Sequence, residues 1–152
     1  MNIRIRLLLL SFLIFHFSFA FAQTAAEMDA VLELDEISAA RAARFVLGAA
    51  DLLPPGISGP EAEKAAYDKA VSNRWIGAAS GEEAVTLKEA SFLIMKAFNL
   101  KGGVMYTLLE NPRYAYRELV YRRIIMGKAD QDMKVSGPKL LLILDKVIRN
   151  EE

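Results

Sequence analysis

The chain has 152 residues, 25% charged and 53% hydrophobic, with no Cys and a single His, His16, which lies in an apolar N-terminal stretch. Without that stretch the protein has neither imidazole nor thiolate. This excludes a Ser-His-Asp triad, a Cys nucleophile, a disulfide and a conventional zinc or haem site. The 19 basic residues equal the 19 acidic ones, so bulk charge does not favour nucleic acid as a partner.

Residues 1–22 have the pattern of a secretory signal peptide. Arg4 and Arg6 precede the apolar run, and Ala20-Phe21-Ala22 supplies a small-x-small cleavage site. The run of about 15 residues is shorter than the about 20 that a membrane-spanning helix needs. We therefore expect cleavage before Gln23, export to the periplasm or cell envelope, and no transmembrane segment afterwards. An uncleaved anchor is the alternative.

Three segments of the remaining chain share one layout. Each places a β-branched residue and a hydroxyl before an apolar helix pattern: Ile37-Ser38, Val85-Thr86 and Val135-Ser136. The stretches between them also align after a shift of 49 residues, which pairs Arg74 with Arg123. Repetition at a long, fixed period indicates helix-loop-helix units that bury their apolar faces against one another.

Capping and stop signals delimit the expected helices. The expected ranges are 39–53 after the cap Ser38, from about 60, 87–100 after the Thr86/Glu89 capping box, from Asn111-Pro112, and 136–150. Gly102-Gly103 are interpreted as the signal that ends the third of these helices, 87–100. The last helix is apolar from Leu140 to Leu144, so we expect it at the centre of the bundle, with Leu141 buried.

The domain organisation follows from these ranges. Residues 25–34 are expected to form a short helix, with a strand as the alternative, inside an N-terminal segment 23–37. Residues 38–152 are expected to form a single all-α domain.

The repeat resembles the S-layer homology module of bacterial cell envelopes. In that family a tyrosine-bearing helix, an apolar-Gly turn and an acidic loop lead to a Val/Ile-Ser/Thr helix start, and the best match here runs from Arg113 to Ser136. The resemblance implies a helical bundle of about two and a half modules, where the family commonly packs three around a pseudo-threefold axis. The family's polysaccharide-binding Arg is replaced by Ala39, Leu87 and Gly137.

The helix after Asn111 carries the candidate binding residues. Tyr114, Arg117 and Tyr121 are spaced i, i+3 and i+7, so they share one helix face and place a guanidinium between two rings. Such a face can stack on a sugar or grip a carboxylate, with packing against an adjacent repeat as the alternative. Arg74 and Trp75 of the preceding repeat are candidate neighbours, and packing is again the alternative for Trp75.

Other polar positions indicate no chemistry. Asp130 and Asp132 suggest a calcium loop, but no acid stands at its twelfth position. Glu82, Glu83 and Glu118 form no catalytic pair that spacing can specify. We therefore expect no catalytic residue, no cofactor and no metal.

We interpret the chain as a non-enzymatic, exported, all-α adaptor or structural subunit that binds a protein partner in an envelope assembly. Two alternatives stay open. One is a peptidoglycan or cell-wall-polymer binding module that uses the same Tyr and Arg side chains. The other is a small carboxylate-dependent hydrolase.

Overall fold

The computed structural model describes residues 26–77, 79–127 and 130–151, and within these ranges the protein is all-helical. The chain divides into two compact units, with the boundary between Leu34 and Asp35. In the first unit, residues 26–32 form a helix, which confirms the predicted short helix over the strand alternative. The predicted leader and its cleavage site lie outside the described residues.

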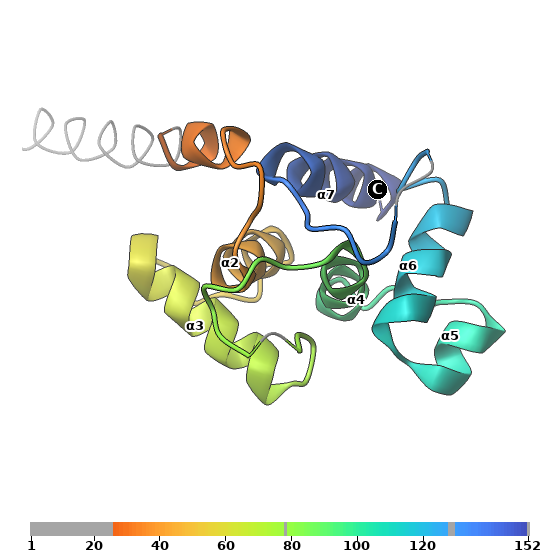
Figure 1. Ribbon diagram of the computed structural model, residues 1–152. Helices are drawn as coiled ribbons and strands as arrows, with labels where there is room; N and C mark the ends of the chain where they lie inside the picture. The colour runs from red at the N-terminus through yellow and green to blue at the C-terminus, as the bar shows by residue number, and fades with distance from the viewer. Residues whose placement is uncertain (1–25, 78, 128–129, 152) are drawn as a thin grey trace, which may run out of the picture. The chain divides into compact units, whose positions relative to one another are not determined.

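The second unit holds the predicted helices and one more (Figure 1). Helix starts agree with the expected ones, but α2 and α4 end earlier than expected. The bounds are α2 Ala39–Ala49, α3 Gly59–Ser72, α4 Leu87–Ala97, α5 Val104–Leu109, α6 Pro112–Tyr121 and α7 Gly137–Glu151. Helix α5 was not expected from the sequence.

The three segments with a shared layout meet in the interior of this unit. Ile37, Val85 and Val135 are fully buried, and their backbones form a closed ring of hydrogen bonds. The N–H of Ile37 donates to the carbonyl of Val135 (2.8 Å), that of Val135 to Val85 (3.0 Å), and that of Val85 to Ile37 (3.0 Å). Each residue donates and accepts once, so the ring satisfies buried backbone groups without a sheet.

Each ring residue is followed by a hydroxyl that caps the next helix. The side-chain oxygens of Ser38, Thr86 and Ser136 accept from the backbone N–H three residues further on, at 3.4, 3.4 and 3.3 Å. At Thr86 the predicted capping box is complete, because Glu89 Oε2 accepts from the Thr86 N–H at 2.9 Å. Such a cap contributes about 1 kcal/mol, and it orients α2, α4 and α7 alike relative to the ring.

Four helices end in the same motif without using glycine. Their last turns are closed by residues with φ of 51–59°, in the left-handed region: Asp51, Arg74, Asn99 and Arg123. At the end of α6, the N–H of Arg123 donates to Val120 O (3.0 Å) and that of Ile124 to Leu119 O (3.0 Å). This is the Schellman motif with its apolar following residue. It explains why α2 and α4 stop before the prolines and glycines that were expected to end them.

Two helix pairs occupy equivalent places in the repeat. α2 packs against α3, and α4 packs against α6. Figure 1 shows α2 and α4 between α3 on one side and α6 with α5 on the other. The predicted small-residue face of α3 is confirmed, because Ala62, Ala66 and Ala70 are buried. Arg41 and Glu63 add an ion pair of 2.9 Å between α2 and α3.

The expectation that α7 lies at the centre of the bundle, with Leu141 buried, is wrong. Leu140, Ile143 and Leu144 are buried, but Leu141 is only half-buried and Leu142 is 56% exposed. α7 is therefore an amphipathic helix. Its apolar surface is wider than the face that is buried, so part of that surface meets solvent. The uninterrupted apolar run did not distinguish this arrangement from a central helix.

Candidate functional site

The unpredicted helix α5 lies against α6, the helix that carries the candidate binding residues. Its inward side is Tyr106, which is 6% exposed and meets the ring of Phe92 on α4 edge-on at 6.5 Å between centroids. Gly102 permits this packing, because a Cβ there would lie 2.7 Å from Tyr106 Cγ. Gly102-Gly103 therefore lead into α5, and the prediction that they end α4 is corrected.

Ionisable groups fasten α5 to its neighbours. Glu110, at the end of α5, pairs with Lys96 of α4 at 2.7 Å. Burial, aided by the charge of Glu110, raises the pKa of Tyr106 to about 12, so its phenol stays neutral. These contacts anchor one side of α5 and leave its other side to solvent.

Glu118 joins α6 to the start of α5. Its Oε2 accepts from the Gly103 N–H at 2.9 Å, and its Oε1 accepts from Arg122 Nε at 2.9 Å. Burial raises the pKa of Glu118, but the Gly103 N–H and the Arg122 guanidinium outweigh it and hold the pKa below its ordinary value. Glu118 is thus a charged structural carboxylate.

The three residues predicted on one face of α6 do lie together. Tyr114, Arg117 and Tyr121 line a cleft of about 310 Å³, whose opposite wall includes Val104 and Met105 of α5. The Arg117 guanidinium carbon lies 5.9 Å from the centroid of the Tyr114 ring, within the range of a cation–π contact. Tyr121 is 84% exposed.

The α5 side of this cleft extends into an exposed apolar surface, which sequence reasoning missed. Val104 is 81% and Leu108 75% exposed, and Met105 and Leu109 are also exposed. Their spacing of i, i+1, i+4 and i+5 is that of one helix face, a signal usually taken for burial. We call the surface made by Val104, Met105, Leu108, Tyr114, Arg117 and Tyr121 the α5–α6 face.

Arg74 and Trp75 do not belong to this face. They lie in the Schellman turn after α3, where Arg74 has φ 58° and the Trp75 N–H donates to Ala70 O at 2.8 Å. Trp75 is half-buried as the apolar residue of that motif. Neither residue lines the α5–α6 cleft. The prediction that Arg74 and Trp75 neighbour the binding residues of α6 is therefore wrong for this cleft.

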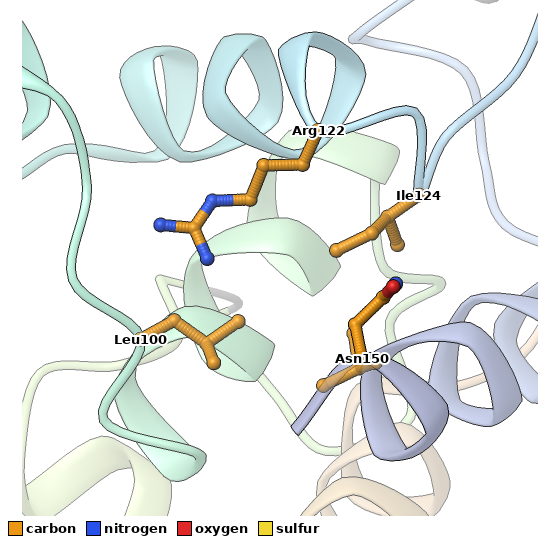
Figure 2. A pocket seen from close by; sticks show the side chains of 5 residues that line it. Leu100, Arg122, Ile124 and Asn150 are labelled. Atoms are coloured by element: carbon orange, nitrogen blue, oxygen red, sulfur yellow. The ribbon is translucent and has the colours of Figure 1, made fainter. Parts of the chain in front are cut away.

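A second cleft, of about 290 Å³, opens where three helices end. Figure 2 shows its lining residues Leu100, Arg122, Ile124 and Asn150, of which Arg122 comes from the end of α6 and Asn150 from the end of α7. The Arg122 guanidinium also donates to the Lys101 carbonyl. No motif marks this cleft in the sequence, because its lining comes from unrelated helix ends.

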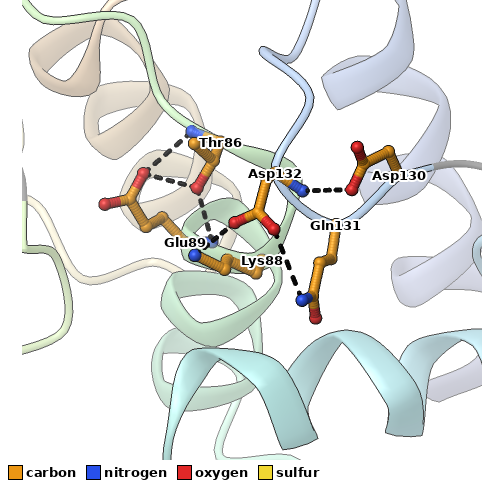
Figure 3. Close-up of polar contacts among 6 residues, drawn as sticks. All are labelled: Thr86, Lys88, Glu89, Asp130, Gln131 and Asp132. Atoms are coloured by element: carbon orange, nitrogen blue, oxygen red, sulfur yellow. Dashed lines mark hydrogen bonds and ion pairs between the residues drawn. The ribbon is translucent and has the colours of Figure 1, made fainter.

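The acidic loop before α7 is joined to α4 by an ion pair (Figure 3). Asp132 pairs with Lys88, and its N–H donates to Asp130 Oδ1 at 3.0 Å. The hydrogen bond between them raises the pKa of Lys88 and lowers that of Asp132. Within the described residues no three Asp, Glu or His side chains gather as a metal site would require. In the loop that suggested a calcium site, the carboxylate of Asp132 is thus engaged in an ion pair with Lys88.

Comparisons with protein-family models, with curated proteins and with solved structures found no match to this chain. Across the part of the chain that the structure describes, none of the helices combines the length and apolarity needed to cross a bilayer. The case for function therefore rests on the α5–α6 face.

Proposed function

We propose that the protein is an exported, non-enzymatic adaptor or structural subunit that binds a protein partner of an envelope assembly through the α5–α6 face. The observation that carries this proposal is the exposure of Val104 and Leu108 beside an unpaired Arg117. No ion pair joins Arg117 to any residue in the described ranges. Clustered apolar side chains on a surface commonly mark a binding site.

The composition of the face fits a protein interface. Tyr, Met and Arg are enriched at such interfaces because they offer large contact areas or forked donors. The exposed side chains of α5 contribute no burial energy to folding, whereas covering a Val- or Leu-sized side chain is worth about 1.5–3 kcal/mol. A partner that covers Val104, Met105 and Leu108 would recover that free energy on binding.

The envelope location rests on the leader pattern and on the resemblance to the S-layer homology module. The closed ring of Ile37, Val85 and Val135 supports that resemblance, because three equivalent helix starts around one point suit a pseudo-threefold bundle. The family's cation after each hydroxyl is replaced at all three of these starts, by Ala39, Leu87 and Gly137. This favours a scaffold over a polysaccharide anchor of the family's usual kind.

The structural contacts of two candidate carboxylates, Glu118 and Glu83, support a non-enzymatic role. A general acid at neutral pH needs a raised pKa, whereas that of Glu118 is lowered by its structural contacts. Glu83 accepts the Ala79 N–H at 3.0 Å and so stabilises its own loop.

One observation favours a second candidate function, binding of a cell-wall polymer. The cleft is lined by the ring of Tyr114 with the Arg117 guanidinium beside it, and flat groups of this kind stack on sugar faces. Such a module would bind purified sacculi in the absence of any protein.

The test is a pull-down from native envelope with the wild type, Arg117→Ala and Tyr121→Ala, and with sacculi as a separate bait. Arg74→Ala is the matched control, because it removes an exposed arginine outside the face. An adaptor loses its partner in the first two variants and keeps it in the control, with unchanged melting temperatures. If both face variants stay folded and keep every partner, the proposal is wrong. Retention on sacculi alone would establish the polymer-binding function instead. Mass analysis of the exported protein tests the leader, for which Gln23 is the expected first residue.

A further inference from the structure

The segment of chain that carries the α5–α6 face has an excess of positive charge. Residues 96–127 contain six basic side chains, Lys96, Lys101, Arg113, Arg117, Arg122 and Arg123, and two acidic ones, Glu110 and Glu118. Both acids are already paired, with Lys96 and Arg122. Arg113 and Arg117 lie one turn apart on α6 and pair with no acid in the described ranges. An occupant of the face should therefore be both anionic and apolar.

The N-terminal helix of the same chain, residues 26–32, and the short segment that follows it have these properties. Residues 26–36 contain five acidic side chains, Glu27, Asp29, Glu33, Asp35 and Glu36, and no basic one. Met28 and Leu32, one turn apart on the helix, are 38% and 49% exposed. Asp29 and Glu33 follow them by one position each and are exposed as well. An apolar stripe thus runs beside an acidic stripe.

We propose that the N-terminal helix of one copy of this chain docks on the α5–α6 face of a second copy. The inference rests on the proposed function, since it uses the same face and names one partner for it. A helix rises 1.5 Å per residue, so Arg113 and Arg117 of α6 are separated by about 6 Å along the helix axis. Asp29 lies in the N-terminal helix and Glu33 directly follows its last residue, so these two carboxylates are also about one turn apart. A helix lying along α6 can therefore form both ion pairs at once, while its apolar stripe covers α5.

The helix and the face are different surfaces, and every copy carries one of each. The contact is therefore heterologous, and successive copies can join into a ring or a chain. An anionic membrane is the other anionic, apolar surface that such a face could meet. The cleft of about 310 Å³ between α5 and α6 favours a docked segment, because side chains can enter it.

The experiment uses the exported protein and two charge-swap variants, Asp29→Lys with Glu33→Lys and Arg113→Glu with Arg117→Glu. Sedimentation equilibrium is measured over a wide range of protein concentration and at low and high salt. The wild type should associate as its concentration rises, and salt should weaken this association. Each variant alone should associate about tenfold more weakly or worse, because two attractive pairs become repulsive. A mixture of the two variants should associate again, since the swapped charges are complementary.

Other outcomes overturn the inference. These are a wild type that stays monomeric at every concentration, an association that neither variant weakens, or one that only the arginine swap weakens. Binding of the monomer to anionic vesicles, abolished by Leu108→Ser, would assign the face to a membrane. If the wild type is monomeric but Arg117→Ala loses an envelope partner, the adaptor function stands and self-association falls.

Discussion

Replacing Gly102 by Ala should destabilise the protein by about 2–4.5 kcal/mol, although it adds a single methyl group. The new Cβ would lie 2.7 Å from both Cβ and Cγ of Tyr106, and no side-chain torsion can relieve the contact with Cβ, which is fixed to the backbone. α5 must then shift, so Tyr106 loses burial worth about 1.5–3 kcal/mol. Its edge contact with Phe92 adds about 0.5–1.5 kcal/mol. The φ of Gly102 is outside the left-handed region, so backbone strain contributes nothing to this cost.

Urea denaturation followed by circular dichroism measures the effect, with Gly48→Ala as the matched control. A Cβ at Gly48 would come no closer than 4.0 Å to Leu53 Cδ1, and this glycine lies within α2. Its replacement should stabilise the protein by about 0.5–1 kcal/mol through helix propensity. If Gly102→Ala proves neutral, or if both variants shift stability in the same direction, then Tyr106 does not depend on that missing side chain and our account of α5 is refuted.

Three further predictions concern α7, the helix ends and the α5–α6 connection. Leu140→Ala should cost about 2–5 kcal/mol in the same denaturation assay, whereas Leu142→Ala on the solvent side of α7 should change stability by less than about 0.5 kcal/mol; equal effects would show that the wrong face is buried. Arg123→Gly should raise the melting temperature, because glycine adopts the left-handed conformation without strain, a gain in stability of up to about 1 kcal/mol. Asn99→Gly should gain less, because Asn tolerates that region. The reverse order would contradict the Schellman assignment. Glu118→Gln should cost about 1–3 kcal/mol at neutral pH. Since the folded-state pKa of Glu118 lies below its ordinary value, its contribution is present above the unfolded-state pKa and lost as pH falls through the folded one, so stability curves of wild type and variant should converge in acid.

Features encoded by adjacent residues were predictable from the sequence. The Thr86/Glu89 capping box and the Asn111 cap of α6 depend on side chains that reach their own backbone, so their spacing along the chain is enough. The grouping of Tyr114 with Arg117 and Tyr121 is likewise set by helical spacing on one element. These parts of the fold and the candidate site needed no tertiary information.

Features that depend on tertiary contacts or on unusual backbone were missed. The ends of α2 and α4 rely on Asp51 and Asn99 in a conformation that glycine usually marks, so glycine-based stop signals failed. Helix α5 lacks a capping side chain and is held by the burial of Tyr106 against α4. Trp75 lies away from the cleft because of the way the repeats pack against one another. The spacing of residues within one repeat does not determine that packing.

The hydrogen-bonded ring of Ile37, Val85 and Val135 also limits how many repeats this architecture can hold. In an open solenoid, each unit offers its next neighbour a fresh surface, so units can be added or removed and the terminal ones need polar caps. In the ring every donor and acceptor is used within the set of three, which leaves no vacancy for a fourth unit. Deleting one unit would leave an orphaned N–H and an orphaned carbonyl in the interior, a penalty of about 1–3 kcal/mol for each group. Duplication or loss of a repeat, the usual route by which repeat proteins change length, therefore carries a cost in this bundle that a change in loop length between the helix starts does not.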